Sequence, residues 1–467
     1  MSSTVPPASP GPALRSSRKV ATASLVGTTI EWYDFFIFGT AAALVFNQVF
    51  FPSVDPVTGT LSAFGAFAVG FIARPLGGAV FAHFGDKVGR KPMLVYSLLL
   101  MGAATVGMGL LPGYDTLGVW APVLLVTLRF LQGFGVGGEW GGAALMAVEH
   151  APSHRRGFYG SWPQVGVPLG LVLGTATFAV LSATLTDEQF LAWGWRVPFL
   201  ASVALIAVGM WIRLGVHESP VFRKAMDEKA ANRMPVLEAL RTYPKEILLA
   251  AGSFLATNST FYVSSVWLVT YATQSLSYDR TTILAANSVL SLSDIPLIMA
   301  FGLLSDRIGR RPMFVGGMAL LAVFAVPYFW LVSTGSIWLF LLGGLVVQVA
   351  RSAVYGPQSA FFAEQFSTSM RYSGASLAYQ IASILGGPRA AAVHRARRAD
   401  RVALRRRRLR RRDRAGVAGL LLAHDRDAPV GAARRRRHRR PDLTPTVRRS
   451  RSPACPVRGC AGPRPGR

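Results

Sequence analysis

Ionisable side chains are rare within the long apolar runs of this 467-residue chain, and two of them are spaced so that they could act together. Glu31 and Asp34 stand three residues apart in the first run, which places them on one face of a helix. At about 1.5 Å per residue, Asp34 lies roughly 20 Å into that helix, near the middle of a bilayer. A carboxylate at that depth is costly unless it is paired, hydrated or protonated. We therefore expect Asp34 or Glu31 to carry a proton, with a structural acid held permanently by an arginine as the alternative.

Three arginines in other apolar runs, Arg74, Arg129 and Arg351, could bind an anionic group. A guanidinium stays charged and presents a planar fork of donors that matches a carboxylate. Arg74 and Arg129 could each neutralise Asp34 or hold a carboxylate of a bound molecule, and the sequence leaves both open. Asp294, also within an apolar run, is a further candidate for a charge pair.

The elements that must position these groups are membrane-spanning helices. Apolar residues make up 51% of the chain and fall in runs near the ~20 residues that cross a bilayer. Helices are the expected form, because lipid leaves open backbone groups without partners and the runs are too long for barrel strands. Eleven spans are predicted, near residues 20–49, 61–84, 93–111, 121–148, 158–185, 197–216, 247–273, 283–304, 313–332, 337–362 and 372–387.

One short basic loop occurs twice. Gly85–Pro92 reads GDKVGRKP and Ser305–Pro312 reads SDRIGRRP, 220 positions later, and each copy follows an apolar run. A repeat at this spacing predicts a membrane protein of two related halves rather than an enzyme with one active site.

The repeated loops are expected to act as latches that open and close with a conformational change. Their glycines allow tight turns, and their aspartates can cap helix N-termini or pair with arginines. A glutamate followed by an arginine after six residues also occurs in both halves. The predicted gating residues are Gly85, Asp86, Gly89, Arg90, Lys91, Glu149, Arg156, Asp306, Gly309, Arg310, Glu364 and Arg371.

The net charge of +27 is concentrated at the end of the chain. Residues 388–467 hold 26 arginines and five aspartates but neither lysine nor glutamate. A basic tail could bind RNA or anionic lipid. However, dense arginine, alanine and proline without lysine is what a GC-rich gene encodes when it is translated out of frame. We favour a frameshift after Gly387, and expect a disordered tail and no nucleic-acid partner.

The remaining charges predict the orientation in the membrane. On one alternating set of loops lie 18 lysines and arginines, against two on the other set, so the N-terminus and both repeated loops are predicted to be cytoplasmic. The first apolar run is as long as a span, which is not the pattern of a cleavable signal. Both cysteines, Cys455 and Cys460, lie in the tail, so no disulfide or thiolate metal site is expected in the membrane part.

These residues resemble the major facilitator superfamily, and within it the metabolite:proton symporter family, over residues 20–387. The loop Gly85–Pro92 is similar to the superfamily signature, although Ala82 stands where glycine is usual. The stretches Glu31–Asp34 (EWYD) and Arg129–Glu139 (RFLQGFGVGGE) resemble the symporter family.

The resemblance implies an all-α membrane fold of two six-helix bundles, alternating access, and a site lined by spans 1, 4, 7 and 10. Here helix 11 is expected to be incomplete and helix 12 absent. The implied substrates are proline or betaine, shikimate, 2-oxoglutarate, citrate and related dicarboxylates. The expected parts are a cytoplasmic N-terminus (1–19), a first bundle (20–216), a central loop (217–246), a second bundle (247–387) and the tail (388–467).

The favoured function is a proton-coupled symporter that imports a small organic acid or zwitterion. Asp34 or Glu31 would carry the proton, and Arg74, Arg129 or Arg351 would hold a carboxylate. Further residues expected to line the pocket are Trp32, Tyr33, Gln132, Gln164, Asn258 and Tyr262.

Other functions are weighed against it. An efflux antiporter of the same fold is weakened by Gly166–Gly170, which reads GVPLG where antiporters usually have a Gly-Pro pair. A sensor or tether that uses the basic tail and a truncated transporter without function remain alternatives. No metal cluster, nucleophile elbow or phosphate loop indicates an enzyme. We expect no cofactor besides the proton, and a monomer in the inner cell membrane.

Overall fold

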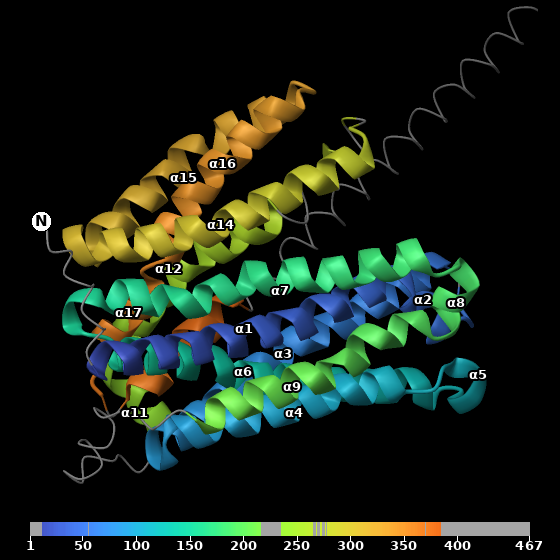
Figure 1. Ribbon diagram of the computed structural model, residues 1–467, viewed down its shortest axis with the longest axis horizontal. Helices are drawn as coiled ribbons and strands as arrows, with labels where there is room; N and C mark the ends of the chain where they lie inside the picture. The colour runs from blue at the N-terminus through green and yellow to red at the C-terminus, as the bar shows by residue number, and fades with distance from the viewer. Residues whose placement is uncertain are drawn as a thin grey trace, which may run out of the picture. The chain divides into compact units, whose positions relative to one another are not determined.

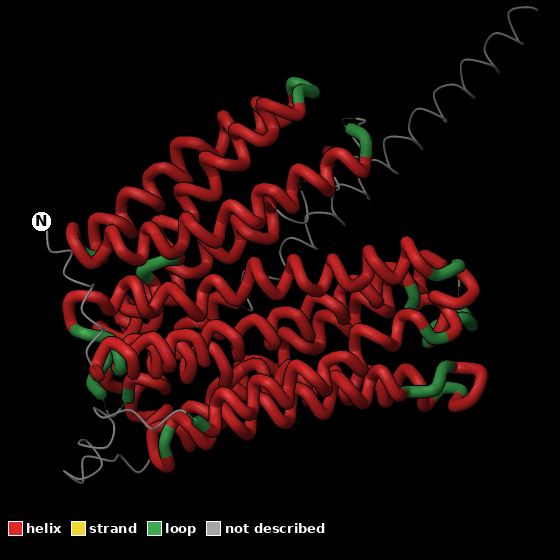
Figure 2. Tube along the Cα trace, viewed as in Figure 1, coloured by secondary structure: helices red, strands yellow, loops and turns green. Residues whose placement is uncertain are grey.

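The computed structural model describes residues 12–54, 56–215, 235–264, 268, 271–272, 276, 278–368 and 370–383. Within these residues every regular element is a helix (Figures 1 and 2). The tail 388–467 and most of the predicted central loop lie outside the described residues. The prediction of an all-α fold is confirmed.

Two halves follow each other along the chain. The first half comprises the long helices α1 (Pro12–Leu44), α3 (Pro56–Val88), α4 (Arg90–Leu110), α6 (Trp120–Glu149), α7 (Arg156–Thr184) and α9 (Val197–Leu214). The shorter helices α2 (Phe46–Val49), α5 (Tyr114–Leu117) and α8 (Asp187–Ala192) lie between them. The second half comprises α11 (Pro235–Thr242), α12 (Pro244–Tyr262), α14 (Arg280–Ile308), α15 (Arg310–Ser333), α16 (Ile337–Tyr355), α17 (Gln358–Gln365) and the helical residues 371–383.

Eight helices of the described chain are long and apolar enough to cross a membrane. The predicted spans at 20–49, 247–273 and 372–387 are not among these eight, although their described residues are almost entirely helical. The predicted span at 337–362 lies within one of these eight, Ile337–Gln365, which contains a short break at Gly356 and Pro357 between α16 and α17. Proline lacks an amide hydrogen and so does not continue the helical hydrogen bonding.

The repeated basic loop forms the same turn in both halves. Gly89 joins α3 to α4 with φ 120°, and Gly309 joins α14 to α15 with φ 95°. Side chains with a Cβ rarely adopt positive φ, so glycine is the residue that such a turn requires. We call the end of the helices that carries these two turns the loop end.

Close contact between α3 and α6 depends on glycine. A Cβ on Gly77 of α3 would collide with the backbone of Phe134, and one on Gly137 of α6 would collide with the backbone of Arg74. In membranes helices associate through small residues that let their backbones approach. This contact is among the most extensive in the chain, together with that of α1 and α7. It places the side chains of α3 next to those of α6.

Aromatic stacking joins the two halves. Trp140 of α6 stacks on Tyr379 of the 371–383 helix, with ring centroids 4.0 Å apart. Phe254 of α12 stacks on the same tyrosine at 4.3 Å. These rings belong to one buried apolar cluster that draws residues from both halves.

We expect Gly137→Leu to destabilise the protein, because the added side chain must push α3 away from α6. Overpacking of this kind costs about 1–3 kcal/mol. Thermal unfolding of the purified chain in detergent should show a lower Tm. Gly65→Leu is the matched control, because Gly65 is an exposed residue of α3 whose Cβ would meet nothing within 4 Å. Equal Tm values for the two variants would contradict the prediction.

Candidate functional site

Arg74 of α3 is a buried cation, with 2% of its surface exposed. Its guanidinium carbon lies over the rings of Trp32, Phe35 and Phe71, at 5.2, 4.4 and 5.2 Å from their centroids. Its Nε and Nη2 atoms have no hydrogen-bond partner among the described residues, and it makes no ion pair with them. Cation–π contacts recover about 0.5–2 kcal/mol, which is less than the several kcal/mol that burial of an ion costs. Arg74 therefore has donors left for an anion.

Arg129 of α6 has a similar environment and is 1% exposed. Its guanidinium lies over Phe35, Phe38 and Phe67, at 4.7, 4.1 and 4.8 Å. Its Nη1 atom donates to Oε1 of Gln132, while Nε and Nη2 have no partner in the described part of the chain. It makes no ion pair there either.

The two arginines belong to one site, because the ring of Phe35 contacts both guanidiniums. Tyr262 of α12, from the second half, is buried within electrostatic range of both cations. Asn258 lies half-buried four residues earlier on that helix. Two buried cations that form no ion pair with the described residues, together with a phenol, make a site suited to a carboxylate.

Asp34 lies inside the first half and is fully buried. Its carboxylate accepts hydrogen bonds from Thr105 of α4 at 3.0 Å and from Ser202 of α9 at 2.6 Å. Neutralisation of Asp34 by Arg74 or Arg129 was one of two open alternatives, and neither arginine forms an ion pair with it among the described residues, although Arg129 lies within electrostatic range. A hydroxyl can donate or accept, so Asp34 can keep both partners whether or not it carries a proton.

Glu31 is also buried, but its surroundings differ from those of Asp34. Its Oε2 atom has no hydrogen-bond partner among the described residues. Arg74, Arg213 and Glu139 lie within electrostatic range of its carboxyl group. Glu31 thus lies between the arginine site and an ion pair in the core of the first half.

Two other buried acids are each bound to an arginine. Glu139 of α6 forms an ion pair with Arg213 of α9 and accepts a hydrogen bond from Ser97 at 3.2 Å. Asp294 of α14 forms an ion pair with Arg351 of α16. Buried pairs of this kind cost several kcal/mol to break. Arg351, which was a candidate to hold a substrate, is therefore occupied within its own half.

Two of the predicted pocket residues hold helices together instead. The hydroxyl of Tyr33 donates to the carbonyl of Pro198 at 3.0 Å, within the first half. Gln164 of α7 accepts from the indole of Trp140 at 2.8 Å and donates to the carbonyl of Tyr355 at 3.2 Å. Trp32, Gln132 and Tyr262 do reach the arginine site, as described above.

Two groups of functional residues were not predicted from the sequence. They are the phenylalanines whose rings lie against the two guanidiniums, and the hydroxyl residues that bind Asp34. Phe35, Phe38, Phe67 and Phe71 occur within apolar runs, where phenylalanine usually signals lipid contact or core. Their spacing could have indicated a stripe, because Phe67, Phe71 and Arg74 recur at intervals of four and three residues, as on one helix face.

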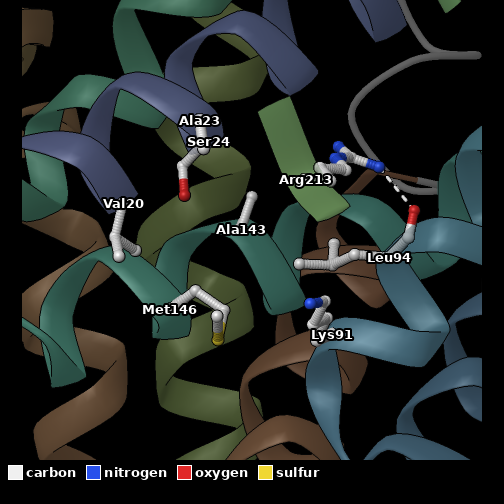
Figure 3. Close-up of a pocket in the computed structure, with 8 residues that line it drawn as sticks. All are labelled: Val20, Ala23, Ser24, Lys91, Leu94, Ala143, Met146 and Arg213. Carbon is white, nitrogen blue, oxygen red and sulfur yellow. Dashed lines mark hydrogen bonds between the residues drawn. The ribbon is translucent and has the colours of Figure 1, made fainter. Parts of the chain in front are cut away.

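A small pocket within the first half is a separate feature. It lies between α1, α4, α6 and α9 and has a volume of about 20 Å³, which is room for roughly one water molecule (Figure 3). Arg213 lines it and donates to the carbonyl of Leu94 (Figure 3). The pocket is too small for a metabolite. Its lining residues are Val20, Ala23, Ser24, Lys91, Leu94, Ala143, Met146 and Arg213.

At the loop end, each half caps a helix of the other. Asp86 of α3 accepts from the backbone amide of Ser373 at 3.0 Å and from its hydroxyl at 2.7 Å, at the start of the 371–383 helix. Asp306 of α14 accepts from the amides of Gly157 and Phe158, both at 2.8 Å, at the start of α7. A negative charge at a helix N-terminus is stabilising. The repeated aspartates therefore make two matching contacts between the halves, which we call the twin caps.

Ion pairs surround the cap at Asp86. Glu149 pairs with Arg90 of its own half and, at 2.9 Å, with Arg371 of the other half. Lys91 donates to the carbonyl of Leu214 at 2.9 Å. Gly85 lies against Tyr372, where a Cβ would collide with the ring.

The second cap has a different set of pairs. Arg310 pairs with Asp306 at 2.9 Å and with Glu364 at 3.4 Å, both in the second half. Arg156 makes no ion pair within the described chain, although the repeated spacing of Glu149 and Glu364 had placed it among the gating residues. The two caps match, but the ion pairs around them do not.

We expect Asp306→Asn to loosen the loop end, because two amides of α7 lose their charged acceptor. A loss of about 1 kcal/mol changes the open population about fivefold. The readout is maleimide labelling of a cysteine placed at the buried Ser161 of α7, with Cys455 and Cys460 replaced by serine. Asp279→Asn is the control, because Asp279 caps α14 within its own half, through the amide of Thr282 at 2.7 Å. Equal labelling rates in both variants would count against a gating role.

Comparisons with known proteins agree with this architecture. Residues 24–388 match the family profile described as Major Facilitator Superfamily. The chain is 43% identical over 377 residues to the shikimate transporter of Escherichia coli (strain K12), covering 80% of this chain and 86% of that one. It is 35% identical over 384 residues to the proline/betaine transporter of the same strain, covering 79% and 76%. In structure it is similar to the proton:xylose symporter XylE bound to 6-bromo-6-deoxy-D-glucose, with a TM-score of 0.66 at 15% identity, covering 81% and 88%.

Proposed function

The chain belongs to the major facilitator superfamily of membrane transporters, and from this we propose that it is a proton-coupled symporter that imports a small organic acid of the shikimate kind. The observation that carries the proposal is the pair of buried arginines, Arg74 and Arg129, which have free donors and no acidic partner in the described chain. A carboxylate placed between them would accept hydrogen bonds from their free donors and offset one of the two buried positive charges. The higher identity to the shikimate transporter than to the proline/betaine transporter points the same way.

A zwitterion such as betaine fits the site less well. Its quaternary ammonium group needs open aromatic faces or a carboxylate. The faces of Trp32, Phe35 and Phe71 are already covered by the guanidinium of Arg74. Glu31 is the acid that could meet a cation, but it lies within range of Arg74 and Arg213. We therefore favour an acid with hydroxyl groups over a compound with a permanent positive charge.

Asp34 is the proposed proton carrier. It is buried, it makes no ion pair in the described chain, and its hydroxyl partners suit either protonation state. Glu139 and Asp294 are each held in an ion pair by an arginine, unlike Asp34. With the loop end cytoplasmic, as the distribution of positive charge predicts, the twin caps would close the cytoplasmic side while the site receives substrate from outside.

We expect Arg129→Gln and Arg74→Gln each to weaken shikimate binding by about 10- to 100-fold, as the loss of a charge-assisted hydrogen bond does. The test is equilibrium binding of labelled shikimate to the purified full chain, with betaine as competitor. The double variant Asp294→Asn, Arg351→Gln is the control, because it removes a buried pair from the same fold without touching the two free arginines. Parental binding by Arg129→Gln would refute the assignment of the carboxylate site.

We expect Asp34→Asn to abolish proton movement coupled to substrate, because the amide keeps the size of the side chain but cannot carry a proton. Alkalinisation of the medium on addition of shikimate to proteoliposomes should fall by more than about tenfold, while exchange of labelled for unlabelled shikimate persists. Glu31→Gln is the matched comparison on the same helix face. Coupling lost in Glu31→Gln but retained in Asp34→Asn would move the proton to Glu31.

A further inference from the structure

A chain of hydrogen bonds leads from Arg129 to Asp34 through two side chains. Nη1 of Arg129 donates to Oε1 of Gln132, and Nε2 of Gln132 donates to the hydroxyl of Thr105 at 2.7 Å. That hydroxyl donates to Oδ2 of Asp34 at 3.0 Å. Every donor points from the cation towards the carboxylate, so each bond polarises the next. All four side chains are buried.

The hydroxyls at the carboxylate end each have a second acceptor. Thr105 Oγ1 lies 2.9 Å from the carbonyl of Met101, besides the carboxylate of Asp34. Ser202 Oγ lies 2.6 Å from Asp34 and 3.4 Å from the carbonyl of Pro198. A hydroxyl has one hydrogen, so it can donate a full hydrogen bond either to the carboxylate or to the backbone carbonyl, but not to both.

The position of this hydrogen depends on the charge of Asp34. An ionised carboxylate draws the hydrogen of Thr105 towards itself and completes the chain to Arg129. A protonated Asp34 must donate its own hydrogen, and the oxygen of Thr105 is an acceptor at hand. The hydrogen of Thr105 then turns to Met101, and the chain loses its negative end.

We propose that Gln132 and Thr105 are positioning residues that couple proton binding at Asp34 to substrate binding at Arg129. The inference rests on the proposed function, in which Asp34 carries the proton and Arg129 holds the carboxylate. The ionised Asp34 stabilises Arg129 through the relay and competes with substrate. Protonation ends this competition, so proton and substrate favour each other's binding, as symport requires.

Among the described residues, Arg129 is the cation that acts on Asp34, and it is also the far end of the relay. From α6, Arg129 acts on Asp34. From α4 and α9, Thr105 and Ser202 contribute hydroxyls. On α1 itself, Tyr33 lies within electrostatic range, with its own hydroxyl bound to the backbone.

The second half contains an Arg–Gln pair of the same spacing that lacks a relay. Nε of Arg351 donates to Oε1 of Gln348 at 3.0 Å, three residues away on α16. Nε2 of Gln348 donates to the carbonyl of Leu290 at 3.3 Å, and Arg351 pairs directly with Asp294. Gln348 therefore provides a matched control for Gln132.

The test measures how the Kd of labelled shikimate for the purified full chain depends on pH. One linked proton changes Kd by up to about tenfold per pH unit. We expect the parent to approach this slope as the pH rises, and Gln132→Met and Thr105→Val each to reduce it below about threefold per unit. The double variant should change the slope no further, because both substitutions break one chain. Gln348→Met should keep the parental slope.

Each result bears on a different claim. At the acidic end of the range Thr105→Val should bind like the parent, because Thr105 lies outside the arginine site and the relay acts only when Asp34 is ionised. Weaker binding by the same factor at every pH would overturn the relay in favour of a purely structural role, and so would a parental slope in Gln132→Met. A parent whose Kd does not depend on pH, or an Asp34→Asn protein that keeps the parental slope, would overturn the proposed function instead.

Discussion

The structure depends on one constraint, which is that a charge within a bilayer must find a partner. Most buried charges here comply, as Glu139 does with Arg213 and Asp294 with Arg351. These pairs join α6 to α9 and α14 to α16, so they fix helices within a half while satisfying the charge. The buried groups that do not comply are then informative. A buried charge without an ion-pair partner lowers the stability of the fold. Its presence is explained only if another group binds to it.

The two halves use equivalent positions for opposite purposes. Arg74 stands twelve residues before Asp86, and Asp294 stands twelve residues before Asp306. In the second half the acid at this position captures Arg351, which leaves no free charge. In the first half the arginine at this position forms no ion pair with a described residue and lies against aromatic rings. In the proposed mechanism the groups that change state therefore lie in the first half.

Much of the two-half architecture was predictable from the spacing of residues in the sequence. The twin loops predicted two related halves, and the glycines at 89 and 309 do adopt positive φ. The depth of Asp34 and Glu31 in the membrane stays a prediction from helical rise. The partners of these two acids could not be predicted from the sequence. The helical period of 3.6 residues tells which face of its own helix a side chain occupies, but not which other helix lies opposite that face. Asp34 thus lacks the arginine that was considered for it and is held by Thr105 and Ser202, whose single hydroxyls carry no signal in an apolar run.

The twin caps are connected to Asp34 and Arg129 through the helices whose N-termini they bind. Asp306 caps α7, and α7 has one of the most extensive contacts in the chain with α1, which carries Asp34. Asp86 caps the 371–383 helix, whose Tyr379 stacks on Trp140 of α6, the helix that carries Arg129. Each cap therefore binds a helix of the other half. In both cases that helix packs against a helix that carries a residue of the relay. A movement that released the caps would shift the packing around both ends of the relay, so that a change at the loop end and a change of protonation at Asp34 need not be separate events.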